Sequence, residues 1–369
     1  MTTSGTRSAA AEDQLLRAAR NGDEDAYARL LETYRGELHA HCYRMLGSVH
    51  DAEDALQEAS LRAWRGLGRF EGRSSLRSWF YTIATNTCLN AIARRPKRVL
   101  PIDYGPATDP HDGLGMPLSE TVWVEPYPDE TIGVADGFAA PDARYEQRES
   151  VELAFVAALQ HLPATQRAVL ILREVLGFSA AEVADTLETT AASVNSALQR
   201  ARKTIDGKLP ERSQQATLRA LGDRKVAEIV ERYIDAMARG DVERVVSMLA
   251  QDAAWSMPPL PTWFSGHDGI AGFLRFGPLS GEWRWRHVPA RVNGQAAVAV
   301  YQWDAGEAAY LPFALDVMTL EGDRIKEITA FIARASEGED REYYERWPEQ
   351  RLDHARFAFE RFGLPGRLD

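Results

Sequence analysis

The sequence predicts a multidomain protein in which two all-α domains, the second a helix-turn-helix, precede an α+β domain. Three observations predict this order. Residues 13–98 and 148–210 carry apolar side chains at helical spacing. A linker at 99–147, rich in Pro, Gly and Asp, separates the two blocks and is too rich in proline for helix or central strand. From residue 218 to about 335, a long helical pattern leads into alternating apolar runs with turn residues between them.

The strand-rich part contains two expected hairpin turns. Asn293-Gly294 and Gly322-Asp323 interrupt alternating apolar runs, as such dipeptides do in tight turns. A charged tail at 336–369 could add a helix. With 369 residues, 45% hydrophobic and 26% charged, the chain is long enough to bury several cores.

The stretch DAEDALQEASLRAWR, residues 51–65, predicts an amphipathic helix. Acidic residues in its first turn and arginines in its last turn suit the helix dipole. Its outward face is polar and acidic, and a solvated surface is one interpretation. This face carries Asp54, Gln57, Glu58 and Leu61, with Asp51 in the first turn.

The next stretch, GRFEGRSSLRSWF at 68–80, places arginines beside aromatic residues. Gly72 permits a tight turn, and Ser74 or Ser75 can cap the following helix. One interpretation is an aromatic core with exposed arginines. The other is a surface that stacks unpaired bases on aromatic rings and binds phosphates with guanidinium groups, with Arg73, Arg77, Tyr81 and Asn86 facing outward or sideways.

The block at 148–210 has the pattern of a helix-turn-helix. Pro163 begins one helix, Gly177 ends it, Ser179 caps the next, and a further helix follows from Thr190 to Ile205. A helical hairpin without a role in DNA binding remains an alternative. In the helix-turn-helix interpretation, Ser193, Asn195, Ser196 and Gln199 face the major groove, while Arg200, Arg202 and Lys203 contact phosphates.

The net charge of -11 argues against binding nucleic acid through a broad basic surface. Any DNA contact must be local or depend on a partner. Cys42 and Cys88 form neither a disulfide framework nor a zinc motif, and the spacing of His39, His41 and His50 around Cys42 does not suit a metal ion. No cofactor is expected. The chain shows no signal peptide or membrane-spanning run, so a cytoplasmic protein is expected.

Two stretches resemble a known family. The run DAEDALQEASLRAWRGLGRFEGRSSLRSWFYTIATNTCLNAIARR resembles the second domain of extracytoplasmic-function (ECF) sigma factors of bacterial RNA polymerase. LPATQRAVLILREVLGFSAAEVADTLETTAASVNSALQRARKTI resembles their fourth domain, which binds the upstream promoter element. The part from 218 to 335 resembles the cone-shaped SnoaL-like fold, related to ketosteroid isomerases, that some members carry as an extension.

The resemblance implies roles for these surfaces. The helix from Asp51 to Arg65 would bind the clamp coiled coil of core polymerase, and the helix from Thr190 to Ile205 would read the minus thirty-five element of promoter DNA. Asn195 stands where many members have Lys or Arg, so the promoter sequence that this chain prefers is expected to differ from theirs. The minus ten element would be melted and bound by Phe70, Arg73, Ser74, Ser75, Arg77, Trp79, Tyr81 and Asn86.

The resemblance also suggests a regulatory part for the C-terminal domain, through an intramolecular contact or a small ligand. VWVEPYPDE in the linker looks like a motif of fused members, and its expected contact residues are Trp123, Glu125, Pro126, Tyr127, Pro128 and Asp129. The cone lining is expected to include Tyr233, Trp255, Trp263, Trp303, Phe313 and Asp316.

Two other functions stay open from the residues. Asp252, Asp316 or His267 could act as a general base in an isomerase or cyclase, although no convincing catalytic pair is present and the protein is not expected to be an enzyme. A one-component regulator, in which the cone binds a ligand and the helix-turn-helix alone binds DNA, is the other alternative.

Overall fold

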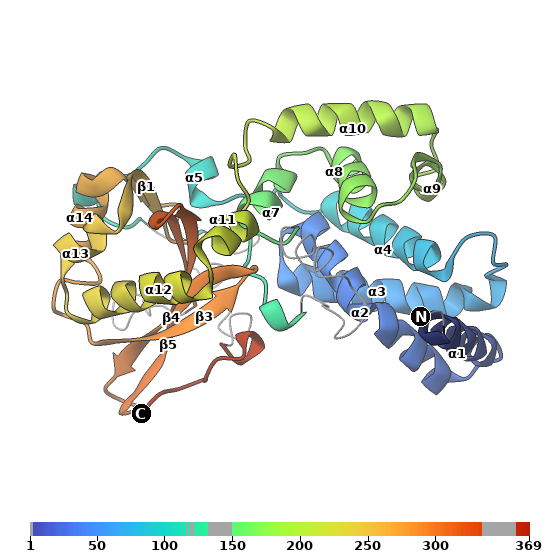
Figure 1. Ribbon diagram of the computed structural model, residues 1–369, viewed down its shortest axis with the longest axis horizontal. Coiled ribbons are helices and arrows are strands. Elements are labelled where there is room, and N and C mark those ends of the chain that lie inside the picture. The colour runs from blue at the N-terminus through green and yellow to red at the C-terminus, as the bar shows by residue number, and fades with distance from the viewer. Residues whose placement is uncertain (1–2, 116, 119–121, 132–149, 334–358) are drawn as a thin grey trace. The chain divides into compact units, whose positions relative to one another are not determined.

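The computed structural model describes residues 3–115, 117–118, 122–131, 150–333 and 359–369 (Figure 1). Within these ranges the chain forms two compact units. One, here called the helical unit, contains residues 3–95, 131 and 158–208. The other, called the sheet unit, contains the described residues of 96–130, 150–157 and 209–369.

Side-chain caps fix the helices of the N-terminal part of the helical unit. Asp23 caps α2, Ser48 caps α3 and Ser75 caps α4, each accepting a hydrogen bond from a first-turn backbone N–H. Gly47, with φ of 69°, ends α2 in the left-handed conformation that glycine adopts without strain. The helices are α1 (Thr3–Arg20), α2 (Glu24–Leu46), α3 (Val49–Gly66), the 3-10 turn η1 (Leu67–Arg69) and α4 (Leu76–Ile92).

The C-terminal part of the helical unit confirms the predicted helix boundaries. Gly177 follows the helical stretch with φ of 72°. Ser179 and Glu182 form a reciprocal capping box at the start of α9, and Thr190 caps α10. The elements are α8 (Ala164–Leu170), the π-helical turn η5 (Ile171–Val175), α9 (Ala180–Thr186) and α10 (Ala191–Ile205), while α7 (Leu153–Gln160) begins in the sheet unit and ends in the helical unit.

The sheet unit contains a six-stranded mixed sheet in the order β2-β1-β6-β5-β4-β3. Only the β1–β6 pair is parallel among these strands. Both predicted hairpin turns are confirmed, because Asn293-Gly294 joins β3 to β4 and Gly322-Asp323 joins β5 to β6. The strands are β1 (Leu249–Ser256), β2 (Trp263–Ser265), β3 (Trp285–Val292), β4 (Gln295–Asp304), β5 (Ala309–Glu321) and β6 (Arg324–Ile332).

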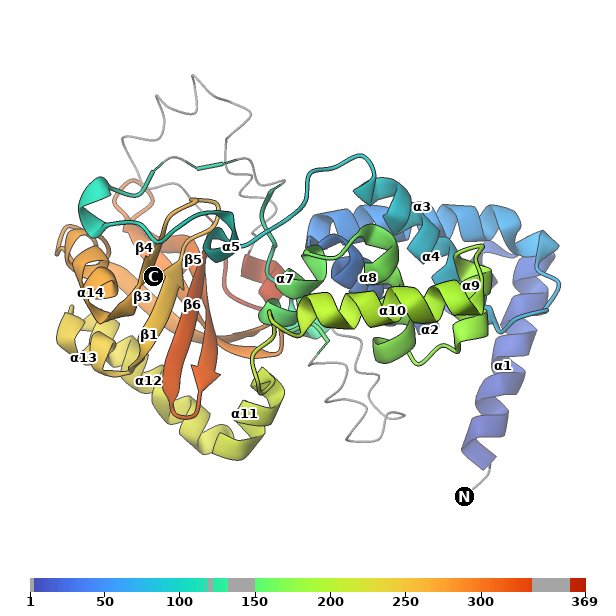
Figure 2. The same cartoon turned by 90° about the horizontal axis from the view of Figure 1, so that it is seen from above.

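Amphipathic helices cover one face of this sheet (Figure 2). Helix α12 packs on β3 and β4, and α14 packs on β1 and β2. Their apolar sides share a core with Val298, Val300 and Met318 of the sheet. The helices are α11 (Gln214–Leu221), α12 (Asp223–Ala238), α13 (Val242–Ser247) and α14 (Gly266–Phe276). This arrangement confirms the predicted α+β domain after two helical domains.

The C-terminal residues cover part of the other face. Tyr301 of β4 is fully buried, its ring centroid lies 5.1 Å from that of Phe359, and its hydroxyl donates a 2.8 Å hydrogen bond to the carbonyl of Pro365. Phe359 belongs to the 3-10 turn η7 (Phe359–Phe362). The charged tail at 336–369 was expected to add a helix, and its residues 336–358 lie outside the described residues.

The linker contains short helices that the sequence did not predict. They are α5 (Pro101–Tyr104), η2 (Pro110–Asp112) and η4 (Asp129–Thr131). The expectation that proline excludes helix from this segment was therefore wrong at Pro101 and Pro110, because proline in the first turn loses no intrahelical hydrogen bond and its fixed φ suits the helix.

Candidate nucleic-acid and partner surfaces

Helix α10 separates its side chains into a buried and an exposed set. Val194, Ala197, Leu198, Ala201 and Ile205 are buried, at helical spacing. The polar residues named from the sequence are all exposed: Ser193, Asn195, Ser196, Gln199, Arg200, Arg202 and Lys203. An α-helix with such a face fits the major groove of B-DNA, which is about 12 Å wide.

Two of these residues have local partners, since the Ser193 hydroxyl accepts a 3.0 Å hydrogen bond from the Thr190 hydroxyl and Arg202 pairs with a glutamate. Arg202 donates a 2.6 Å hydrogen bond from Nε to Glu174. Both side chains lie at the surface, so the ion pair is weak and a phosphate could replace the carboxylate. Among the other cations, Arg200 and Lys203 lie one helical turn apart on the same exposed side, as groups that contact one DNA strand would.

The arginine and aromatic stretch is divided between surface and interior. Arg73 is the most accessible of these residues, with 86% of its side chain exposed, and it pairs with Glu71 at 2.5 Å. Ser74 and Ser75 are exposed, and Trp79 and Asn86 are half-buried. Phe70 is 7% exposed, with its ring centroid 5.2 Å from that of Trp79. The loop around Arg73 is therefore open to a ligand, while the buried Phe70 ring packs against Trp79.

Tyr81 occupies a different environment, because the helix-turn-helix part covers it. Tyr81 is 1% exposed, and its ring centroid lies 5.3 Å from that of Phe178. The guanidinium carbon of Arg77 lies 4.9 Å from the centroid of each of these two rings. Burial raises the pKa of the Tyr81 hydroxyl above its usual value. In this arrangement Tyr81 has no surface available to a base.

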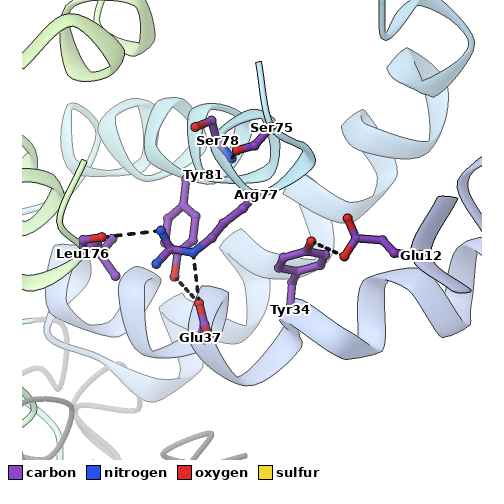
Figure 3. A network of polar contacts seen from close by, with 8 residues as sticks. All are labelled: Glu12, Tyr34, Glu37, Ser75, Arg77, Ser78, Tyr81 and Leu176. Carbon is purple, nitrogen blue, oxygen red and sulfur yellow. Dashed lines mark hydrogen bonds and ion pairs between the residues drawn. The ribbon is translucent and has the colours of Figure 1, made fainter. Parts of the chain in front are cut away.

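Polar contacts hold this cluster together (Figure 3). Glu37 accepts hydrogen bonds from the Tyr81 hydroxyl at 3.2 Å and from Arg77 Nε at 3.4 Å. Arg77 Nη1 also donates to the carbonyl of Leu176 at 3.4 Å. One arginine thus links α2 and α4 to the segment that precedes the helix-turn-helix.

Helix α4 also contacts α9, the first helix of that motif. The Ser78 hydroxyl donates a 3.3 Å hydrogen bond to Glu182, and the hydroxyls of Thr82 and Thr186 lie 3.0 Å apart. The Ser179 backbone N–H holds the pKa of the Glu182 carboxyl below its usual value, so this acceptor is ionised at neutral pH.

The outward face of α3 is as polar as the sequence suggested. Asp54, Gln57 and Glu58 are exposed, and Leu61 exposes 46% of its surface. Arg62 pairs with Glu58 at 2.7 Å. This face therefore combines one exposed apolar side chain with acidic and polar neighbours.

Asp51 lies in the interior of the helical unit. Its exposure is 4%, and it forms an ion pair with Arg95. Because its carboxylate is buried and paired, Asp51 stabilises the end of α4 against α3 and offers little surface to a partner.

The linker residues Trp123 to Pro128 are buried in the sheet unit. Arg98 Nη1 donates to the carbonyl of Trp123 at 2.6 Å and lies 3.4 Å from Glu125. Pro126 is buried beside them, and Pro128 pairs with Val292 as an isolated β-bridge.

The Asn293-Gly294 turn holds the linker. Asn293 Oδ1 accepts a 2.8 Å hydrogen bond from the Tyr127 N–H, and the Asn293 N–H donates at 2.9 Å to the Tyr127 carbonyl. Asp129 accepts from the Gly294 N–H at 2.6 Å and pairs with Arg291 at 3.6 Å. The linker thus forms part of the sheet unit.

A cavity of about 150 Å³ lies between the sheet and its helices. Trp255, Phe313 and Asp316 line it, and Tyr233 donates a 2.8 Å hydrogen bond to Asp316 Oδ2. Trp263 instead donates from its indole N–H to the Gly105 carbonyl, and Trp303 packs on Tyr310, so neither is among the described lining residues.

Two of the three candidate general bases lie elsewhere. Asp252 is on the surface and pairs with Lys326 at 2.5 Å. His267 donates to the carbonyl of Ala250 at 3.1 Å. Only Asp316 of the three lines the cavity, where burial raises its pKa to about 7.

The N-terminal histidines and cysteines take structural positions. His41 Nε2 lies 2.9 Å from the Thr85 hydroxyl, and burial lowers the His41 pKa to about 3. Cys42 and Cys88 are buried free thiols. In the part of the chain that the structure describes, no group of His, Cys, Asp or Glu side chains is arranged to hold a metal ion. The described helices also include none with the length and apolar character needed to span a membrane.

Three family descriptions match the chain. Residues 30–98 match Sigma-70 region 2, residues 152–205 match Sigma-70, region 4, and residues 230–328 match the SnoaL-like domain. The chain is also 43% identical over 315 residues to the ECF RNA polymerase sigma factor SigG of Mycobacterium tuberculosis, covering 85% of this chain and 82% of that protein. This chain belongs to the ECF sigma factors.

Other relatives of this ECF sigma factor match over a shorter range. The ECF RNA polymerase sigma factor SigW of Bacillus subtilis is 28% identical over 192 residues, which is 52% of this chain and 92% of that protein. The crystal structure of the ECF sigma factor SigJ of Mycobacterium tuberculosis has a TM-score of 0.52 and 21% identity, covering 83% of this chain and 96% of that chain. The SigJ structure therefore has the same fold over most of this chain.

Some residues of this ECF sigma factor that shape the surfaces were not identified from the sequence. Glu37, Leu176 and Phe178 complete the Arg77 and Tyr81 cluster, although they are distant in sequence. Asn293 was identified as a turn residue only. Its side-chain contact with the linker has no sequence signal, because it depends on two segments meeting in the fold.

Proposed function

We propose that this ECF sigma factor binds core RNA polymerase and directs it to promoter DNA in the cytoplasm. The single observation that carries the proposal is α10, a capped helix whose apolar side is buried and whose polar and basic side is wholly exposed. In this proposal Asn195, Ser196 and Gln199 read base edges of the upstream element, and Arg200 and Lys203 contact phosphates.

The loop around Arg73 is the proposed site for the melted downstream element. Because 86% of the Arg73 side chain is exposed, a phosphate can replace Glu71 as its partner, and half-buried Trp79 can offer part of its ring to a base. Unstacking a base costs a few kcal/mol, and stacking on an aromatic ring of about 1 to 3 kcal/mol offsets it.

Tyr81 can join this site only after Phe178 moves away. Because Tyr81 and Arg77 pack on Phe178, full use of the predicted downstream surface requires the helix-turn-helix part to separate from α4. The contacts of α4 that must break are half-exposed hydrogen bonds and a cation–π contact, each worth about 1 kcal/mol, while the buried hydrogen bond from Arg167 to the Met45 carbonyl also joins the two sigma regions. Binding to polymerase can supply that free energy.

Core polymerase is the proposed partner of the α3 face. Its exposed members are Asp54, Gln57, Glu58 and Leu61, which together offer an apolar contact surrounded by polar groups. A partner that brings its own cationic surface also explains how a chain of net charge -11 works on DNA.

The SnoaL-like domain is proposed to modulate transcription rather than to catalyse a reaction. Its Asn293-Gly294 turn and Arg291 hold the linker between the two sigma regions, so the domain constrains the chain that connects them. Asp252 and His267 lie away from the cavity, so of the three candidate general bases only Asp316 lines it.

Run-off transcription with purified core polymerase tests the proposal. The full chain is expected to form a complex with core polymerase and to start RNA at defined promoters, while the free chain binds the same DNA weakly. Arg73→Ala should lower open-complex formation about tenfold, the equivalent of one charge-assisted contact. Arg224→Ala is the matched control, because Arg224 is also exposed and paired with a nearby glutamate.

Other outcomes would point to the alternatives. Tight, specific promoter binding without polymerase would support a one-component regulator. Turnover of a cyclic ketone that disappears in Asp316→Asn would support an isomerase. Equal transcription by the wild type and Arg73→Ala would contradict the proposed role of the loop.

A further inference from the structure

The cavity of the SnoaL-like domain is apolar over most of its wall. Its volume is about 150 Å³, and its wall includes Met237 of α12, Trp255 of β1, Phe273 of α14, Trp285 of β3 and Phe313 of β5. An apolar cavity of about this size in another protein binds benzene. The space therefore suits one ring of six atoms.

Polar side chains interrupt this apolar wall, among them Asp316, His287, Gln302 and the indole of Trp255. Asp316 accepts the Tyr233 hydrogen bond through only one of its oxygens, Oδ2. In the described residues, neither ring nitrogen of His287 has a hydrogen-bond partner, and the same holds for the indole N–H of Trp255. Buried polar groups in folded proteins are almost always paired. His287 and Trp255 both line this cavity, which makes their unpaired nitrogens the candidate partners of a bound molecule.

The charge of the site favours an uncharged molecule. Burial lowers the pKa of His287 to about 4 and raises that of Asp316 to about 7, so both side chains are largely uncharged in mildly acidic solution, between these two values. The described lining contains no lysine or arginine. An anionic ligand would have no counter-ion there, and burying an unpaired charge is costly.

We propose that this cavity binds a neutral single-ring compound carrying one hydroxyl or carbonyl group. The ring fills the space between the aromatic and methionine side chains. The ligand oxygen accepts a hydrogen bond from Trp255 or His287, and a ligand hydroxyl donates to His287 or Asp316. This inference does not depend on the sigma-factor function of the helical unit.

The linker contributes directly to this site. Leu114, which precedes the buried Trp123 to Pro128 stretch, lines the cavity. Its carbonyl accepts a hydrogen bond from the Thr262 hydroxyl, and the Leu118 N–H donates to the Pro259 carbonyl at 3.0 Å. A bound ring therefore contacts the segment that connects the two sigma regions, and Leu114→Ala should weaken binding.

Calorimetric titration of the full chain with phenol and with cyclohexanone tests the inference. Saturable one-to-one binding is expected. Ala330→Leu should abolish it, because Ala330 lines the cavity and the larger side chain fills the space of the ring. His287→Phe should weaken it about tenfold, the equivalent of one hydrogen bond to a buried group.

One surface variant and a second cavity-filling variant serve as controls for this titration. Asp252→Asn changes an exposed carboxylate of the same domain and should bind phenol like the wild type. If Ala330→Leu does not fold, as judged by circular dichroism, Ala314→Val fills the same cavity by a smaller step and should reduce binding. The absence of saturable binding to the wild type, or binding that persists unchanged in the filled variants, would overturn the inference.

Discussion

Arg77 stacks on Phe178, with 4.9 Å between the guanidinium carbon and the ring centroid. Arg77 lies in the part that matches Sigma-70 region 2, and Phe178 lies in the part that matches region 4. This contact joins the two sigma regions through a residue that is also a candidate for DNA binding.

A double-mutant cycle on Arg77 and Phe178 should give a favourable coupling energy of about 0.5 to 1 kcal/mol, because the cation is half-exposed. Urea unfolding of Arg77→Ala, Phe178→Leu and the double variant measures it. The Arg284 and Trp303 pair, at 4.7 Å, is a matched control in the sheet unit. A coupling energy of zero for Arg77 and Phe178, with a favourable value for Arg284 and Trp303, would show that the contact does not hold the two sigma regions together.

Replacing the exposed leucine of α3 should weaken the complex with core polymerase. Leu61→Ser removes an apolar side chain that is 46% exposed, and a loss of about tenfold in affinity is expected if it lies at the centre of the interface. Ile102→Ser changes an apolar side chain of similar exposure, 38%, in the sheet unit and should leave affinity unchanged. Fluorescence titration of labelled core polymerase provides the measurement, and equal affinities for both variants would contradict the α3 interface.

Asn293→Ala should destabilise the sheet unit by about 2 to 4 kcal/mol, since two buried backbone groups lose hydrogen-bond partners. These are the Tyr127 N–H, at 2.8 Å, and the Val151 carbonyl, at 2.7 Å. Asn293 also has φ of 57°, where alanine is strained. Asn293→Gly removes the strain and keeps the hydrogen-bond loss, so urea unfolding of both variants separates the two effects. A neutral result for Asn293→Gly would mean that the linker contact adds no stability.

Asp316 should make stability fall as the pH rises from about 4 to about 7. Its pKa in the folded chain is about 7, above the ordinary value of 3.8, so the folded state holds a proton that the unfolded state has lost within this window. Asp316→Asn has no carboxyl at this position that can bind or release a proton. The stability of Asp316→Asn relative to the wild type should therefore increase across this range and stay constant above it.

The comparison with the wild type is needed because His287 acts in the opposite direction. Its lowered pKa, about 4, makes stability rise with pH up to the ordinary value of 6.5. His287 is present in both proteins, so its contribution cancels in the difference. A difference in stability that does not change with pH would contradict the proposed protonation of Asp316.

Local sequence signals predicted the helices and turns well. Ser179 and Thr190 cap their helices, Gly177 takes a positive φ, and Asn293-Gly294 forms a hairpin, because each depends on neighbouring residues alone. The apolar spacing of α10 likewise separated its exposed polar side from its buried side.

The sequence did not predict contacts between segments that are distant along the chain. Tyr81 is buried by Phe178, and Asp51 is buried with Arg95, although helical spacing alone allowed both to face outward. Trp263 and Trp303 were expected in the cone, yet they pack against the linker and against Tyr310. Aromatic composition indicates a core, but the side of a bent strand that faces a cavity depends on sheet curvature and on β-bulges such as that between Val300 and Tyr301.

Selection of transcribed promoters from a randomised library, by core polymerase with the wild type or Gln199→Ala, tests whether α10 reads the upstream element. Gln199→Ala should change base preference at one or two positions of that element and leave the downstream element unchanged, because Gln199 lies on the exposed side of α10. Identical preferences for both proteins, or a uniform loss of transcription without a change in preference, would contradict it.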